Sequence, residues 1–154
     1  MVKIYKKTIK EDFESAVMKG NKRRKYLLKK LIVNIVDENY EKVQKLVQAG
    51  AEVNGVDNLG MNPLTYAVGT GNITMIDYLI ENGADVNSVD VSGMTPLMRT
   101  IKNYKFNEGY YIVKALLKRG ADVTLGFEGK SPLVFAMLYN PLYTGILKRF
   151  GAKF

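Results

Sequence analysis

The chain of 154 residues is 47% hydrophobic and 25% charged, a composition typical of one folded domain and not of a disordered segment. It contains neither cysteine nor histidine, which excludes disulfide bonds, thiolate metal sites and every serine–histidine or cysteine–histidine mechanism. The net charge is +8, and residues 1–30 carry all of the excess, with eleven Lys/Arg against three acidic residues.

The first 23 residues form a basic N-terminal segment. Its capping-box pattern, Thr8-Ile-Lys-Glu11, predicts a cap helix over residues 8–19. A cluster of cations follows, with the sequence KGNKRRK at residues 19–25 and two further lysines, Lys29 and Lys30. Such a cluster is either a solvated helix face or a contact for an anionic surface, a membrane or nucleic acid.

No apolar run approaches the roughly 20 residues of a membrane span, and the first residues lack the pattern of a signal peptide. Together with the absence of cysteine, these features favour a cytoplasmic location.

Internal repeats dominate the rest of the chain. Three segments align as QAGAEVN at residues 48–54, ENGADVN at 81–87 and KRGADVT at 118–124, and a truncated copy, FGA, follows at 150–152. A turn recurs as DNLG at 57–60, DVSG at 90–93 and FEG at 127–129. A helix start recurs as NPL at 62–64, TPL at 95–97 and SPL at 131–133. Ordered markers recurring in phase indicate a repeat architecture.

These markers resemble the ankyrin repeat, with its 33-residue period, its Thr-Pro-Leu-His start and its Gly-Ala-Asp-Val-Asn end. The resemblance covers residues 24–154 and implies an all-α fold, a solenoid of stacked helix-turn-helix units with short β-turn fingers. It divides the domain into units of about 24–56, 57–89, 90–125 and 126–154. The histidine of the family motif is replaced by Thr65, Met98 and Val134, so we expect the stack to depend more on packing.

Local signals agree with this arrangement. Pro63, Pro96 and Pro132 suit the first position of a helix, after the N-cap residues Asn62, Thr95 and Ser131. Gly83 and Gly120 suit left-handed helix ends. An apolar stripe of Ile73, Ile76, Leu79 and Ile80 predicts one buried helix face, and Asn140-Pro141 predicts the N-cap and start of the last helix.

The third unit carries about four extra residues near Tyr104-Lys-Phe-Asn107, which we place in a loop between its two helices. Such a loop is either neutral drift in a tolerant connection or a binding loop. Tyr110 aligns with Ile73 and is expected in the core, whereas Tyr111 is the better candidate for an exposed contact.

The resemblance implies that partners bind the turn tips and the exposed face of the first helices. The tip residues are Asn58, Leu59, Met61, Val91, Ser92, Met94, Phe127, Glu128 and Lys130. The helix-face residues are Tyr66, Thr70, Arg99, Lys102, Asn103, Phe135 and Tyr139, and Tyr111 joins them at the third unit.

Several of these positions are apolar, which favours a binding surface because solvent alone would favour polar residues there. The alternative is that the tips fold against each other and bury these side chains locally.

Taken together, the sequence predicts a protein-binding module, not an enzyme, with no cofactor or metal. No phosphate-loop or dinucleotide pattern is present. We expect a monomer whose partner is another protein. Nucleic acid is disfavoured because no recognised nucleic-acid-binding module is present, and a membrane contact could come only through the basic N-terminal end. The alternative function is an adaptor that docks by that end to an anionic surface.

Overall fold

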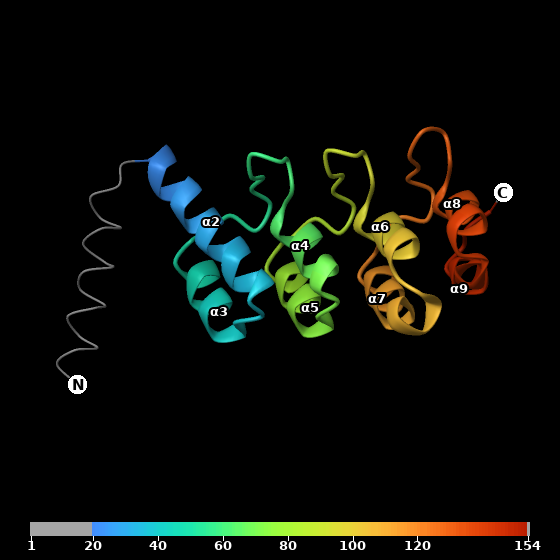
Figure 1. The fold of residues 1–154 in the computed structure, drawn as a ribbon, viewed down its shortest axis with the longest axis horizontal. Helices are drawn as coiled ribbons and strands as arrows, with labels where there is room; N and C mark the ends of the chain where they lie inside the picture. Colours follow the sequence, from blue (N-terminus) through green and yellow to red (C-terminus); the bar gives the residue numbers. More distant parts are fainter. Residues whose placement is uncertain (1–19, 154) are drawn as a thin grey trace.

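The computed structural model describes residues 20–153, so the predicted cap helix over 8–19 lies outside the described residues. Within them, helices pair and the pairs stack side by side in one row (Figure 1). The pairs are α2 (Asn21–Val36) with α3 (Tyr40–Gln48), α4 (Pro63–Thr70) with α5 (Ile73–Glu81), α6 (Pro96–Asn103) with α7 (Phe106–Lys118), and α8 (Pro132–Tyr139) with the 3-10 helix η1 (Pro141–Tyr143) and α9 (Thr144–Arg149).

The described residues contain no β-strand, and the only β-bridge among them joins Phe127 to Lys130. No helix in this part of the chain is both long and apolar enough to cross a membrane. The all-α solenoid is therefore confirmed.

Each of the last three pairs starts as the sequence predicts. The side chains of Asn62, Thr95 and Ser131 accept hydrogen bonds from the backbone N–H three residues later, and a proline follows each of them. At the other end of the units, Gly83 and Gly120 have φ of 92° and 91°. Only glycine adopts this left-handed conformation without a steric penalty, so each helix pair ends where the repeat requires it.

The core runs continuously through the stack because each unit buries its apolar face against the next. In the second unit, Ile76 and Leu79 are fully buried as expected, whereas Ile73 and Ile80 are only partly buried. Met75, which the predicted stripe omits, is fully buried.

The extra residues of the third unit are not a loop, so that prediction is wrong. Only Tyr104 and Lys105 separate α6 from α7, just as two residues separate α4 from α5. The insertion instead lengthens α7 to 13 residues, compared with nine in α5. Because an α-helix has 3.6 residues per turn, four residues add about one turn and leave the apolar stripe in phase.

The lengthened helix changes how the last two units are joined. The hydroxyl of Tyr143, which is fully buried, donates to the carbonyl oxygens of Tyr104 (3.3 Å) and Lys105 (3.1 Å). The amide of Asn140 also donates to the Tyr104 carbonyl (3.3 Å). Asn140 and Pro141 are the N-cap and first residue of η1, as predicted, although the Asn140 side chain makes no capping bond to that helix. Burial, and then the charge of Glu108, raise the pKa of Tyr143 to about 12, so the buried phenol stays neutral.

Tyr104 makes the same kind of hydrogen bond between units, one unit earlier. Its hydroxyl donates to the carbonyl oxygens of Val68 (2.7 Å) and Gly69 (2.9 Å), near the end of α4. The Val68 carbonyl also accepts from the N–H of Gly71, which caps α4, so the Tyr104 hydroxyl adds a contact between units at the end of this helix. Two tyrosines therefore hold the third unit to the second and the fourth to the third.

A ladder of asparagines links the units on the side of the loops that leave the second helices. Asn54 donates to the Gly83 carbonyl (2.7 Å) and accepts from the Asp85 N–H (2.8 Å). Asn87 repeats both contacts one unit later, with the Gly120 carbonyl and the Asp122 N–H. Thr124 occupies the next equivalent position, but it bonds only to Asp122 in its own loop. In the described residues this ladder therefore does not reach the fourth unit.

Candidate partner-binding surface

The loops between helix pairs form three fingers, which we define as residues 57–61, 90–94 and 127–130. They project to one side of the stack, at the top of Figure 1. In the first finger the backbone N–H of Asp57 donates to the Met61 carbonyl (3.1 Å), and its carboxylate accepts from the N–H groups of Leu59 and Met61. Asp90 makes the equivalent bonds to residues 92 and 94 in the second finger. Both fingers are thus fixed in shape by their own hydrogen bonds.

The remaining carboxylate oxygen ties each of these fingers to its first helix. The Tyr66 hydroxyl donates to Asp57 Oδ2 (2.6 Å), and Arg99 Nε donates to Asp90 Oδ2 (2.8 Å). Burial raises the pKa of the Asp57 carboxyl, but the hydrogen bonds from Tyr66, Met61 and Leu59 outweigh it, so the pKa lies below its usual range. The polar groups of Tyr66 and Arg99 are therefore engaged inside the units.

The third finger is one residue shorter and is built differently. Phe127 and Lys130 exchange two backbone hydrogen bonds (3.0 and 2.9 Å). Phe135 stands at the position of Tyr66 and Arg99, and it is only 3% exposed. The prediction that Phe135 lies on the exposed helix face is therefore wrong, since in this unit no aspartate begins the finger and an apolar side chain is buried instead.

Neighbouring fingers pack on each other. A Cβ built on Gly60 would lie 2.2 Å from Cγ1 of Val91, and one built on Gly93 would lie 2.7 Å from the ring of Phe127. Each glycine thus leaves room for a side chain of the next finger. Met61, Met94 and Phe127 are half-buried, so these three tips are less exposed than predicted, and for Phe127, which packs against Gly93, the alternative of burial between fingers holds.

Two apolar tip residues remain in solvent: Leu59 is 66% exposed and Val91 is 68% exposed. Asn58, Ser92 and Glu128 beside them are exposed as well, whereas Lys130 is half-buried with its Nζ 3.6 Å from Glu128 Oε2. The fingers therefore present a narrow, partly aliphatic ridge to solvent.

Further along the first helices, the surface is basic and aromatic. Lys102 Nζ lies 5.5 Å from the centre of the Tyr139 ring, within range of a cation–π contact. Tyr139 and Asn103 are exposed, and the Thr70 hydroxyl donates to the Ala67 carbonyl in its own helix. These side chains lie at the C-terminal ends of the first helices, whereas the fingers precede the N-terminal ends.

Tyr111 is 62% exposed, but the structure does not bring it to the fingers. It lies on α7, where it borders a shallow depression of about 350 Å³ shared with Ile73 and Asp77 of α5 and with Arg119. This depression belongs to the row of second helices, which lies below the first helices in Figure 1. Tyr111 is therefore a separate surface feature.

Comparison with known protein families agrees with this geometry. A family model described as ankyrin repeats (3 copies) matches residues 31–126, which is more than half of the chain. The chain belongs to the ankyrin repeat family. The match begins within α2 and ends beside the third finger, so α8 and α9 form a further ankyrin-like pair outside it. No curated protein shows significant similarity to the chain. Ankyrin repeats are generally protein–protein interaction modules and are typically not enzymes.

Proposed function

We propose that this chain binds a protein partner through the fingers and the exposed face of the first helices. The observation that supports this most is the exposure of Leu59 and Val91 on fingers that hydrogen bonds already hold in shape. A surface fixed before binding loses little conformational entropy on association, and aliphatic side chains gain free energy when a partner covers them.

Replacing both Leu59 and Val91 by Asp is expected to weaken capture of the native partner about 100-fold, because two charges would have to be buried without counterions. Affinity is measured with the purified partner after its capture from the native source. The circular dichroism spectrum and the melting temperature should stay within error, since both side chains already lie in solvent.

Leu142→Asp is the matched control, because Leu142 is 67% exposed but lies on η1, away from the fingers. This variant should keep full affinity. Undiminished capture by the finger variant, or an equal loss in the control, would refute the proposal.

A second candidate function is docking to an anionic surface through the basic N-terminal end. It is favoured by α2, whose 16 residues include six Lys/Arg and no acidic residue. Salt separates the two functions: a contact driven by phosphates is expected to weaken steeply between roughly 50 and 200 mM salt, whereas an aliphatic contact changes much less. Partner affinity that is unchanged both after removal of residues 1–19 and after reversal of Lys22, Lys25, Lys29 and Lys30 to Glu would exclude this candidate.

A further inference from the structure

The N-terminal half of α2 lies beside the first finger, as an additional member of the finger row. α2 has 16 residues, whereas α4, α6 and α8 have eight each. In Figure 1 its N-terminal turns rise from the stack to the level of the fingers. Residues 50–55 lead into the first finger and form its base. They line a shallow pocket of about 470 Å³.

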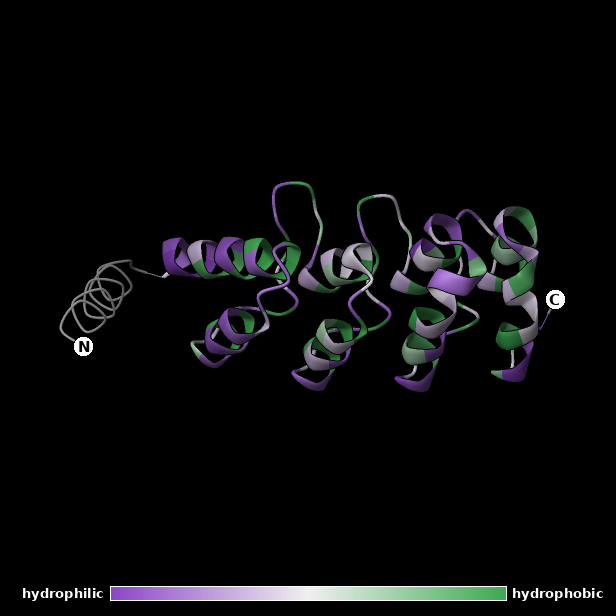
Figure 2. Cartoon of the chain, turned by 60° about the horizontal axis from the view of Figure 1, so that its bottom comes forward, coloured by the Kyte–Doolittle hydropathy of each residue, from purple (hydrophilic) through white to green (hydrophobic). Residues whose placement is uncertain are grey.

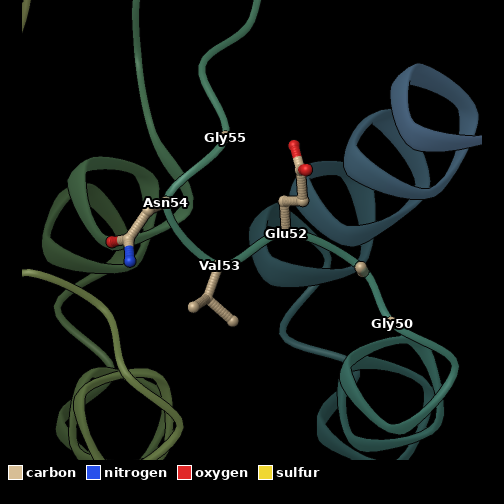
Figure 3. Close-up of a pocket in the computed structure, with 6 residues that line it drawn as sticks. Gly50, Glu52, Val53, Asn54 and Gly55 are labelled. Carbon is tan, nitrogen blue, oxygen red and sulfur yellow. The ribbon is translucent and has the colours of Figure 1, made fainter. Parts of the chain in front are cut away.

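Two contacts fix the extended part of α2 against that base. A Cβ built on Gly55 would lie 3.0 and 3.2 Å from the two methyl carbons of Leu28. Arg24 Nε lies 3.4 Å from Glu52 Oε1. Figure 3 shows Glu52 beside α2, while Asn54 points the other way, toward the next unit. The cationic helix and the finger ridge are therefore neighbouring parts of one face.

Basic charge is concentrated at the α2 end of this face. The N-terminal turns of α2 are hydrophilic in Figure 2, and Lys22, Arg23 and Lys25 are exposed there. Residues 37–89, which form most of the first two units, contain eight acidic residues and only two basic ones. A uniformly charged polyanion that followed the stack would be attracted by α2 and repelled by the acidic excess of residues 37–89, whereas residues 90–153 are net basic again, with ten Lys/Arg against four acidic residues.

Beyond α2, the ridge is largely uncharged and its members touch each other. Val91 rests on Gly60 beside the exposed Leu59, and Phe127 rests on Gly93. Adjacent helices pack 8–10 Å apart, and an extended chain advances about 3.3 Å per residue. An extended segment crossing the fingers would therefore meet a new finger about every third residue.

We infer that α2 and the fingers form a single binding surface for an extended protein segment, with acidic residues clustered at one end and aliphatic residues spaced along the rest. The acidic cluster lies over Lys22 and Lys25, and the aliphatic side chains cover Leu59 and Val91. This inference rests on the proposed function and names the kind of partner for it.

The test is selection of phage-displayed random peptides of about 16 residues, enough to span the row in extended form, on the full chain. Selected peptides are expected to carry two or more Asp/Glu at one end and aliphatic residues near every third position. Selection without an acidic cluster, or with a helical spacing of apolar residues, would overturn the inference.

Variants then locate the two halves of the peptide. Reversing Lys22 and Lys25 to Glu is expected to weaken the selected peptides at least tenfold, and replacing Leu59 and Val91 by Ser to weaken them comparably. The control reverses the same number of charges at Lys105 and Lys153, which are exposed elsewhere, and should leave affinity within twofold. An equal loss in the control would show a net-charge effect and overturn the inference.

A competition experiment tests whether another kind of anion is the preferred ligand. A single-stranded oligonucleotide or vesicles containing phosphatidylserine that bind more tightly than the selected peptides would overturn the inference. The proposed function fails separately: if the Asp variants of Leu59 and Val91 abolish native capture while selected peptides lack an acidic cluster, the finger surface stands and only the extension to α2 falls.

Discussion

Gly109→Ala is expected to destabilise the protein by about 2 kcal/mol, although the same change within a helix normally stabilises by up to about 1 kcal/mol. Gly109 lies in the extra turn of α7. A Cβ there would be 2.1 Å from the hydroxyl oxygen of Tyr143 and 2.7 Å from Cβ of Tyr104. The glycine leaves room for the buried phenol that joins the fourth unit to the third, and a methyl group would push it out.

Urea unfolding measures this effect, and Gly145→Ala is the control. Gly145 lies in α9, where an added Cβ meets nothing within 4 Å, so this variant should be as stable as the parent or slightly more so. Adding Tyr143→Phe to Gly109→Ala should recover part of the loss, since the clashing oxygen is gone. If the two alanine variants are equally stable, the close contact at Gly109 is wrong.

Arg99→Leu is expected to cost about 3 kcal/mol, because it leaves a buried carboxylate without its counterion. The Asp90 side chain is 1% exposed, and Arg99 pairs with its Oδ2 through both Nε and Nη2. The second finger should also become less ordered in this variant, because Asp90 organises its turn by accepting from the N–H groups of residues 92 and 94.

The equivalent site in the second unit supplies the comparison for Arg99. Tyr66→Phe removes a single neutral donor from Asp57, which keeps its bonds from Leu59 and Met61. We expect a cost of about 1 kcal/mol there. Thermal unfolding of both variants decides the matter: a loss at Arg99 no larger than the loss at Tyr66 would show that the ion pair contributes little.

The repeat itself could be predicted from the sequence because its markers act locally. Pro63 begins a helix after Asn62 for reasons confined to a few residues, and Gly83 takes a left-handed conformation that other residues avoid. Signals of this kind can be recognised without knowing which residues pack against them. The fold class and the order of the four units followed from them.

The lengthened helix was mispredicted because the sequence of an insertion does not show whether it extends a helix or a loop. Four residues equal about one helical turn, so the apolar stripe ending in Leu116 and Leu117 reads the same with or without the insertion. The decisive contact, Tyr143 beside Gly109, joins residues in different units. No local pattern shows it.

The positions of the fingers along the chain could be predicted, but the exposure of their side chains could not. Leu59 and Val91 are exposed, whereas Phe127 packs against Gly93 and Phe135 is buried. Whether a finger side chain faces solvent depends on the neighbouring finger, and that dependence spans more than thirty residues. The roles of all these residues in binding remain predictions.

The asparagine ladder makes the second unit interchangeable with copies of itself. Residues 57–89 receive the ladder from Asn54 through Gly83 and Asp85, and pass it on through Asn87. In a tandem duplication of these 33 residues, each Asn87 would meet the Gly83 and Asp85 of the next copy in the same register. The third unit, with its longer helix and with Thr124 closing on its own loop, lacks this property. Growth of the array by gene duplication would therefore favour the second unit over the third.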